Sequence, residues 1–203
     1  MNFAVVNIKG GVAKTTTAVH LSAYLQKMGA TILFDGDPTH NALAWQQRGN
    51  GFPFQIADVR MAIKLAGSFK HSVTDTAQAP TDEDLQYLAQ ASDLLIVPTT
   101  PRPLDTDGLQ QTIQAFQRLN VKHYRVLITN CPPPTEPEGK ELTDLLKELD
   151  VPVFKGEIPR LKAFTRASGA GLLVSDVKDP RAARGWSAYE AIGKEALRYA
   201  CRS

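Results

Sequence analysis

A segment near the start of the chain carries the residues best suited to chemistry. It follows a short apolar run, precedes a helical pattern, and reads Lys9-Gly10-Gly11-Val12-Ala13-Lys14-Thr15-Thr16. In a turn between a strand and a helix, backbone N–H groups and the helix N-terminus converge on a phosphate. We expect Gly10 and Gly11 to permit the tight turn. Lys14 would then reach the β- and γ-phosphates, and the Thr15 hydroxyl would bind Mg²⁺.

The spacing departs from the common phosphate-binding pattern and matches a second one. In G-x-x-x-x-G-K-[ST] two glycines are required, but Ile8 and Ala13 stand in their positions. With Lys9 early in the loop, K-G-G-x-x-K-T-T resembles the deviant Walker A box of the ParA/MinD superfamily of ATPases. Further resemblances are Asp35-Gly36-Asp37-Pro38 as its D-x-D-P, Asp75 as its Walker B acid, and Ile158-Pro159-Arg160 as its segment near the adenine.

This resemblance implies a role for each site residue. Lys9 would cross a dimer interface to the partner's ATP, so the nucleotide would lie between two subunits and its hydrolysis would weaken the homodimer. Lys9, Lys14 and Asp37 are the expected catalytic residues, with Asp37 positioning the attacking water. Together with Thr15, Asp35 and Asp75 would hold Mg²⁺ mainly through water molecules. The remaining expected nucleotide contacts are Gly10, Gly11, Val12, Ala13, Thr16, Asn130, Pro159 and Arg160.

Some of these residues have a simpler reading. Asp35 and Asp37 could end a strand and cap the next helix. The stretch before Asp75 is polar for a buried strand, so Asp75 could be a plain residue at a strand end. Ala13 replaces a common glycine, which is harmless only if φ is negative. Because a helix begins just after it, we expect helical dihedrals at Ala13.

The elements that must position these residues alternate along the chain. Short apolar runs alternate with amphipathic segments, which predicts an α/β fold, a P-loop NTPase with a mostly parallel twisted β-sheet and helices on both faces. The strand candidates are 3–7, 31–35, 69–75, 93–98, 125–130 and 153–158. Helical patterns cover 15–28, 109–119, 138–149 and 183–201, with a loop over 101–107. We expect a single domain over residues 1–203.

Length and composition exclude several classes of protein. With 203 residues, 43% hydrophobic and 22% charged, the chain can bury one sizeable core and is not typical of disordered or disulfide-rich proteins. No apolar run approaches the ~20 residues that span a bilayer. No basic flank or cleavage site of a signal peptide precedes the first apolar run, so we expect a cytoplasmic protein.

Charge is unevenly distributed along the chain. The net charge of +2 combines −3 over residues 1–150 (13 basic, 16 acidic) with +5 over residues 151–203 (ten basic, five acidic). Cations that contact phosphates give salt-dependent affinity for DNA without sequence preference. The DNA-binding candidates are Lys155, Lys162, Arg166, Lys178, Arg181 and Arg184. For each of them, a solvated helix face is the alternative.

The leading interpretation is an ATP-dependent dimerising switch that positions intracellular cargo. The chain resembles the small ParF-like branch, which lacks an N-terminal DNA-binding extension, and McdA-type carboxysome-positioning ATPases. That resemblance implies ATP-bound homodimers that coat nucleoid DNA non-specifically. A ParB-like or McdB-like adaptor on the cargo would stimulate hydrolysis and release. The cargo would be plasmid or chromosomal DNA, or a carboxysome-like compartment.

Two other classes share the motif. A MinD-like membrane switch needs a C-terminal helix with bulky apolar and basic faces. Residues 187–203 are rich in alanine, with Ile192 and Leu197 the only large aliphatic side chains. We therefore expect a packed terminal helix and no membrane partner. The third class is a metabolic P-loop ATPase, such as an iron–sulfur reductase or a ligase-type synthetase. The reductase needs two cysteine thiolates in each subunit facing the dimer axis, which Cys131 and Cys201 fit poorly.

Overall fold

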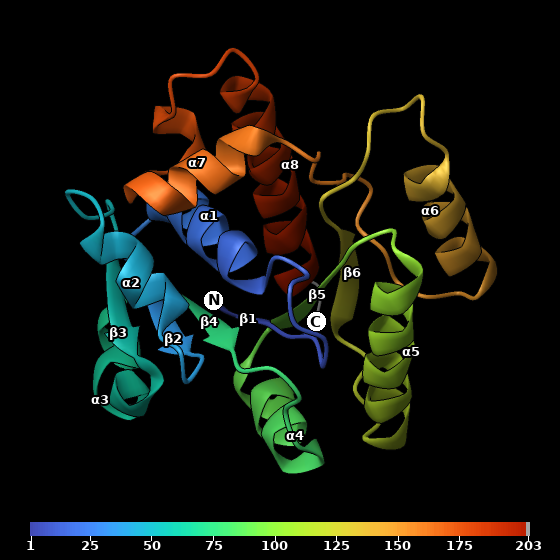
Figure 1. The fold of residues 1–203 in the computed structure, drawn as a ribbon. Coiled ribbons are helices and arrows are strands. Elements are labelled where there is room, and N and C mark those ends of the chain that lie inside the picture. The colour runs from blue at the N-terminus through green and yellow to red at the C-terminus, as the bar shows by residue number, and fades with distance from the viewer. Residues whose placement is uncertain (202–203) are drawn as a thin grey trace.

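A parallel sheet of six strands forms the centre of the protein (Figure 1). In the computed structural model, which describes residues 1–201, the strands are β1 (Asn2–Val5), β2 (Thr31–Gly36), β3 (Gln55–Asp58), β4 (His71–Thr76), β5 (Leu94–Thr99) and β6 (Tyr124–Ile128). They lie in the order β3-β2-β4-β1-β5-β6, and every neighbouring pair is parallel. The predicted α/β fold is therefore confirmed.

Helices cover both faces of this sheet. They are α1 (Lys14–Gln26), α2 (Asn41–Gln47), α3 (Ala62–Leu65), α4 (Asp82–Ala91), α5 (Pro103–Arg118), α6 (Glu138–Glu148), α7 (Lys162–Ala170) and α8 (Ala182–Ala200). Short 3-10 turns lie at η1 (Val59–Met61), η2 (Ala66–Ser68) and η3 (Val174–Asp176). Of the four predicted helices, α1, α6 and α8 agree with their predicted bounds to within two residues at each end, whereas α5 begins earlier than predicted.

Alternating side chains of the strands build two apolar cores. Ala4 and Leu95 belong to a core that is closed by α4, α5 and α6. Val5 and Ile96, one position along each strand, belong to the other core, which is closed by α1, α7 and α8. Because successive side chains of a strand point to opposite faces, both faces must be covered. The two cores hold the strand ends, and therefore the loops that follow them, in fixed positions.

The predicted strand 153–158 is wrong. The segment runs beside β6 but forms only isolated bridges, from Val153 to Val126 in the middle of β6 and from Pro159 to Cys131 beyond its end. The N–H of Phe154 donates to Val126, and the N–H of Ile158 donates to Ile128. Between these bonds the segment leaves the sheet, and proline at position 159 has no N–H to extend the ladder.

The predicted loop over 101–107 is also too long. α5 already begins at Pro103, and proline suits the first turn of a helix, where its missing N–H would have no partner. The strand β3 and the helices α2, α4 and α7 lie outside the predicted elements. β3 is only four residues long and buries one of them fully, so it leaves a weak alternating pattern.

The C-terminal helix is packed, as predicted. Ile192, Gly193 and Ala196 of α8 are buried against the core that contains α1. A Cβ added at Gly193 would lie 2.1 Å from the Tyr24 ring, so only glycine lets the two helices approach this closely. Among the helices of residues 1–201, none is both long enough and apolar enough to cross a membrane.

Candidate functional site

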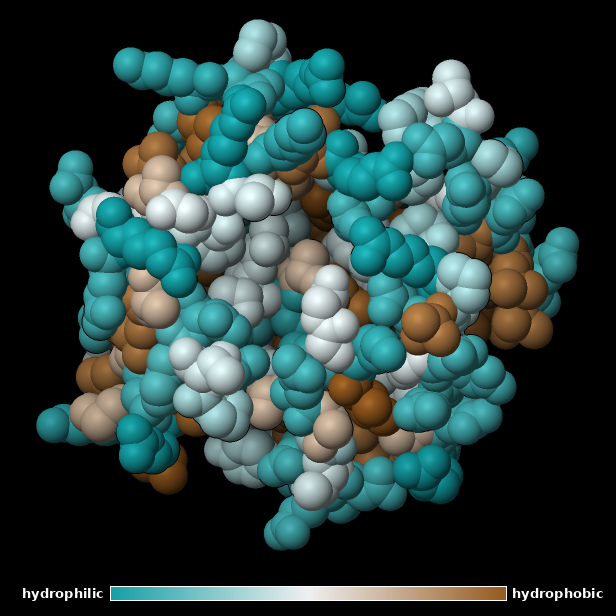
Figure 2. Space-filling model, in the orientation of Figure 1, coloured by the Kyte–Doolittle hydropathy of each residue, from teal (hydrophilic) through white to brown (hydrophobic). Residues whose placement is uncertain are grey.

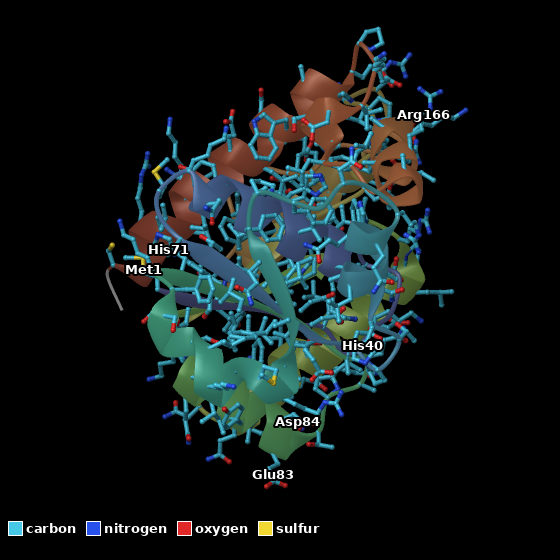
Figure 3. The ribbon with its side chains drawn as sticks, turned by 90° about the vertical axis from the view of Figure 1, so that its left-hand side faces the viewer. Met1, His40, His71, Glu83, Asp84 and Arg166 are labelled. Atoms are coloured by element: carbon cyan, nitrogen blue, oxygen red, sulfur yellow. The ribbon has the colours of Figure 1, made fainter. Side chains whose placement is uncertain are left out.

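The carboxyl ends of the strands form the edge of the sheet where the chemically active residues meet. The register places Asp75 of β4 between Val5 of β1 and Asp35 of β2. Figure 3 shows His40, in the loop after β2, on the opposite side of the molecule from Met1 and His71, which mark the amino-terminal edge. In open parallel sheets, ligands bind outside the carboxyl ends of the strands.

A cavity of 470 Å³ opens at this edge. Of the predicted residues, it is lined by Gly11, Ala13, Lys14, Thr15, Thr16, Asp37, Asn130 and Pro159. Further lining residues, which the sequence analysis missed, are Asn41, Trp45, Arg48, Gln78, Thr129, Ile158, Leu161, Phe164, Thr165, Ser168 and Tyr189. The volume lies within the range of small-molecule sites. The predicted phosphate and base segments therefore meet around one space.

The loop between β1 and α1 is braced by a side chain that the sequence analysis missed. Asn7 is buried, and its Nδ2 donates to the carbonyl of Pro98 at 2.8 Å. Its Oδ1 accepts the N–H of Lys9, also at 2.8 Å. Gly11 has a φ of 78°, a conformation that glycine adopts without strain. Asn7 and Gly11 together hold the loop in a tight turn whose exposed tip faces the cavity.

The expected helical dihedrals at Ala13 are wrong. Ala13 has φ 68° and ψ 35°, in the left-handed region, and it is the N-cap of α1. Its carbonyl already accepts the first helical bond, from the N–H of Thr17 at 2.9 Å. An N-cap residue lies outside the helix in its own dihedrals. The helix therefore begins one residue too late to impose its conformation on Ala13, and the alanine is strained.

Lys14 places a cation inside the cavity wall. Its side chain is mostly buried, and its Nζ donates to the carbonyl of Lys9 at 2.9 Å. Burial lowers the pKa of Lys14, and the carboxylates of Asp75 and Asp37 oppose that change. A cation with little water around it interacts strongly with a nearby anion. Lys14 is thus suited to bind phosphate oxygens.

The loop after β2 is held by its own aspartates. Asp35 is fully buried; its Oδ1 accepts the N–H of Asp37 at 3.2 Å, and its Oδ2 accepts the N–H of Leu43 in α2 at 3.0 Å. Asp37 Oδ1 accepts the N–H of Thr39 at 2.8 Å. The simpler reading, in which both residues cap the following turn, is thus part of the geometry. Asp37 also lines the cavity, whereas Asp35 lies behind it.

Asp75 differs from both of these carboxylates. It is fully buried, and neither of its oxygens has a hydrogen-bond partner within residues 1–201. Burial, with a contribution from Asp35, raises its pKa to about 7; the nearby Thr15 hydroxyl and Lys14 oppose the rise. The Asp75 oxygens and the Thr15 hydroxyl are hard ligands of the kind that Mg²⁺ prefers. The predicted metal residues Thr15, Asp35 and Asp75 therefore lie close together.

This cluster does not form a complete cage for a metal. Within residues 1–201, no group of three or more His, Cys, Asp or Glu side chains has the arrangement to hold a metal ion. Mg²⁺ commonly keeps several water molecules and binds through one or two protein groups and the phosphates of a nucleotide. The donor set at Asp75 fits Mg²⁺ of that kind.

One end of the cavity is lined by the segments for which the sequence predicts contact with the base. Asn130, with φ 50°, and Pro159 lie on its wall, as predicted. Thr129 connects this end to the phosphate loop, because its hydroxyl donates to the carbonyl of Val12 at 3.0 Å. Tyr189 adds an aromatic side chain to the lining. Thr129 is a polar residue just after the end of β6, and that position could have predicted its contact with the phosphate loop.

A buried histidine supports this wall from behind. The His20 ring stacks on Tyr189 with centroids 4.8 Å apart. His20 Nδ1 bonds the carbonyl of Thr16, and Nε2 accepts the N–H of Val174. Those two bonds need the neutral ring with its proton on Nδ1. Burial lowers the pKa of His20 to about 4, which keeps it in this form.

Four predicted nucleotide contacts do not line the cavity. Gly10 and Val12 lie in the loop but are not among the residues that line the cavity, and the Arg160 guanidinium pairs with Glu136 at 2.9 Å. Lys9 is exposed, and its stem packs over Gly108 of α5, where an added Cβ would lie 2.6 Å from Lys9 Cβ. Lys9 therefore lies at the surface beside its own cavity.

Most of the predicted DNA-binding cations gather at one end of the molecule. Lys162 and Arg166 lie on α7, Lys178 and Arg181 on the loop before α8, and Arg184 at the start of α8. Figure 2 shows hydrophilic side chains over this end, and Figure 3 shows Arg166 projecting from it. Arg166 pairs with Asp179 at 2.7 Å; within residues 1–201 the other predicted cations form no ion pair.

Lys155 lies apart from this group. It lines a smaller cavity of 320 Å³ along α8, together with two cations that the sequence analysis missed, Lys194 and Arg198. Glu195 and Tyr199 complete the polar lining, and the Glu195 carboxylate accepts the N–H of Lys155 at 3.1 Å. Lys194 and Arg198 are spaced as residues on one face of a helix are, and this spacing could have predicted that they lie together.

Comparison with known proteins places this site in a family. A family model described as the CobQ/CobB/MinD/ParA nucleotide binding domain matches residues 3–174. The maintenance of carboxysome distribution protein A of Gloeobacter kilaueensis is 34% identical over 198 residues, which cover 95% of this chain and 92% of that protein.

Solved structures share the fold at lower identity. An ATP complex of a Cyanothece McdA variant has a TM-score of 0.75 at 16% identity and covers 97% of this chain and 96% of that one. A plasmid partition protein of Borrelia burgdorferi bound to AMPPNP has a TM-score of 0.76 at 18% identity, over 97% and 98% of the two chains. The solved structures show the shared fold, and the family model together with the Gloeobacter relative shows that the chain belongs to the CobQ/CobB/MinD/ParA nucleotide-binding family.

Proposed function

We propose that the chain is an ATPase that dimerises with ATP between its subunits and uses hydrolysis to release the dimer. The observation that carries this proposal is that two lysines of one loop lie in different environments. Lys14 is buried beside Asp37 and Asp75 in the cavity, whereas Lys9 is exposed beside that cavity. A lysine in this position is available to a nucleotide held by a second subunit.

The residues around the cavity have the chemistry for phosphoryl transfer. Lys14 and the exposed N–H groups of the loop would bind the phosphates, and Asn130 and Pro159 would frame the base. Thr15, Asp35 and Asp75 would hold Mg²⁺, which neutralises phosphate charge when it is bound. Asp37 would orient the attacking water, since phosphoryl transfer depends mainly on positioning and charge.

The proposed cellular role is the positioning of cargo. The relative from Gloeobacter is named for carboxysome distribution, and the Borrelia neighbour for plasmid partition. We propose that the ATP-bound dimer of this chain binds nucleoid DNA non-specifically through the cations of α7 and the start of α8. A ParB-like or McdB-like adaptor on a carboxysome-like compartment or a plasmid would then stimulate hydrolysis.

Binding to random-sequence DNA tests this role. Affinity is measured at several salt concentrations with ATP, with ADP and without nucleotide. We expect binding with ATP only, with an affinity that falls steeply as salt rises. Equal binding in all three states, or none in any, would contradict the proposed switch.

A variant of Lys9 tests the dimer. Lys9→Ala should still bind ATP but lose ATP-driven dimerisation, measured by light scattering. Lys122→Ala is the matched control, because Lys122 is exposed just before β6, at the amino-terminal edge of the sheet. A Lys9→Ala protein that dimerises with ATP like the control would remove Lys9 from the interface.

A further inference from the structure

Asp37 is held in one orientation by the residue two positions along. Asp37 Oδ1 accepts two hydrogen bonds from Thr39, one from its N–H at 2.8 Å and one from its hydroxyl at 2.5 Å. Two donors on one oxygen fix the carboxylate, because any rotation of the side chain breaks both bonds. Thr39 itself is exposed and does not line the cavity. Thr39 therefore reaches the site only through the residues that it bonds, of which Asp37 is one.

A third residue completes the hydrogen bonding of the Thr39 hydroxyl. Asn41 Nδ2 donates to Thr39 Oγ1 at 2.7 Å. The Asp37 carboxylate can only accept, so the single hydroxyl proton of Thr39 points to it, and Asn41 donates to a lone pair of the same hydroxyl oxygen. Asn41, Thr39 and Asp37 thus form a chain of bonds that runs toward the cavity, which both Asn41 and Asp37 line.

This arrangement determines which oxygen of Asp37 is available for chemistry. Oδ1 is occupied by Thr39, whereas Oδ2 accepts no hydrogen bond from a residue within 1–201. The backbone of Asp37 is held separately, by Asp35 Oδ1. The main chain is thus fixed by Asp35 and the side chain by Thr39. Asp37 lines the cavity, and Oδ2 is the oxygen of this carboxylate that no residue within 1–201 bonds, so it is the acceptor left for a water molecule.

We propose that Thr39 is a positioning residue for ATP hydrolysis, holding Asp37 so that Oδ2 orients the attacking water. The inference rests on the proposed function, because it needs Asp37 to act on that water. A carboxylate that rotates freely spends little time in the productive orientation, and small displacements in an active site reduce rates severely. The binding of ATP does not depend on this orientation.

The test compares valine and serine at position 39. Thr39→Val keeps the shape and the N–H but removes the hydroxyl, whereas Thr39→Ser keeps both donors. We expect kcat for ATP to fall about tenfold in Thr39→Val, with KM and ATP-driven dimerisation unchanged. Thr39→Ser should restore kcat to within about twofold of the wild type. If valine does not fold at this position, Thr39→Ala serves in its place.

A matched control separates positioning from stability. The Thr81 hydroxyl donates to Asp84 Oδ2 at 2.7 Å at the start of α4, so Thr81→Val removes the same kind of bond outside the cavity lining. We expect lower stability but wild-type kcat. An equal fall of kcat in Thr81→Val and Thr39→Val, or wild-type kcat in Thr39→Val, would overturn the role of Thr39.

A variant of Asp37 distinguishes the proposed role of Thr39 from the proposed role of Asp37, on which it rests. Asp37→Ala should abolish turnover, and adding Thr39→Val to it should change nothing further, because the two residues act as one unit. Wild-type turnover in Asp37→Ala would overturn the role of Asp37 and with it that of Thr39. Loss of turnover in Asp37→Ala together with full activity in Thr39→Val would overturn only the role of Thr39.

Discussion

The ends of β2 and β4 lie side by side, and each carries a buried aspartate. The two aspartates differ in whether their oxygens accept hydrogen bonds. Asp35 and Asp75 are both fully buried and are direct neighbours in the register of the sheet. Each oxygen of Asp35 accepts a backbone N–H, one from Asp37 and one from Leu43. Neither oxygen of Asp75 has a partner within residues 1–201. The end of β2 is complete by itself, whereas the end of β4 carries an unsatisfied acceptor.

This difference separates a residue that stabilises the fold from one that is kept for a ligand. A buried carboxylate without partners destabilises the folded state or takes up a proton. The raised pKa of Asp75 is that second response. Asp35 organises the loop that carries Asp37 without needing any bound group. An unsatisfied carboxylate beside Thr15 is understandable if a cation supplies the missing partner when nucleotide binds.

Among the substitutions predicted here, Asp75→Asn should change the free energy of unfolding most, and it should increase it although a buried charged group is replaced. The folded pKa of Asp75, about 7, lies above its ordinary value of 3.8, so the folded state binds the proton more tightly. The resulting penalty is absent at low pH, grows as pH rises from about 4 to 7, and is complete above the folded pKa. Asp75→Asn should therefore stabilise the nucleotide-free protein at pH 8 by on the order of 4 kcal/mol, and much less at pH 4.

Urea denaturation at pH 4, 6 and 8 in the presence of a chelator measures this effect. The same variant should weaken the stabilisation that Mg²⁺ and ATP confer, because the cation loses a ligand. A gain in stability that is equal at all three pH values, or a loss at pH 8, would show that the Asp75 carboxylate is satisfied in solution, and the comparison with Asp35 would fail.

His20 extends the comparison to a group that is satisfied only when neutral. Its folded pKa of about 4 lies below the ordinary 6.5, so acid favours the unfolded state. Stability contributed by neutral His20 is complete above pH 6.5 and is lost as pH falls toward 4, by about 3 kcal/mol. Protonation turns Nε2 into a donor that faces the N–H of Val174, and the nearby Asp176 compensates only in part.

The measurement is the difference in unfolding free energy between the wild type and His20→Phe. At pH 7 the variant should be less stable, because the N–H of Val174 and the carbonyl of Thr16 lose their partner. As pH falls to 4 the difference should shrink, since phenylalanine has no proton to gain. Other titrating groups are common to both proteins and cancel. If the difference in unfolding free energy between the two proteins does not change with pH, His20 is not neutral in the folded state in the way described.

The fold and the phosphate loop could be predicted because their signals are local. Lys9 to Thr16 occupy eight consecutive positions, and their spacing alone indicates a turn before a helix. The strands β1, β2 and β5 contain continuous apolar runs, which a sheet covered on both faces requires. Neither inference needs knowledge of which distant residues meet.

The rest depends on contacts between distant segments. The dihedrals of Ala13 follow from where α1 begins, and the predicted strand 153–158 fails because its pairing with β6 is interrupted. The unsatisfied state of Asp75 becomes visible only when β4 lies between β1 and β2. Tyr189 lines the site, and His20, 169 positions away in the sequence, stacks on its ring from behind. No local pattern marks such pairs.

Replacing Asp35 should have a moderate effect of the opposite sign to Asp75→Asn. In Asp35→Asn, one of the two carboxylate oxygens is replaced by an NH2 group, which cannot accept a hydrogen bond. The N–H that this oxygen accepted, from Asp37 or from Leu43, then has no acceptor. One buried donor loses its partner, and we expect a loss of about 2 kcal/mol in the nucleotide-free protein. Urea denaturation at pH 8 with a chelator compares the two variants directly. If both asparagine variants shift stability in the same direction, the two strand ends do not differ in the way proposed.

The smallest effect concerns strain in the backbone of the phosphate loop. Ala13 and Gly11 both have positive φ, 68° and 78°, but only glycine adopts it freely. Ala13→Gly should relieve the strain and stabilise the nucleotide-free protein by about 1 kcal/mol, after the greater freedom of glycine in the unfolded chain is subtracted. Gly11→Ala should destabilise it by about 1 to 2 kcal/mol from strain alone, because no atom lies within 4 Å of the added Cβ. Thermal unfolding of both variants checks the pair. A destabilised Ala13→Gly would mean that α1 begins earlier in solution and that Ala13 is helical, so the loop, like Asp35, would be free of strain before it binds a ligand.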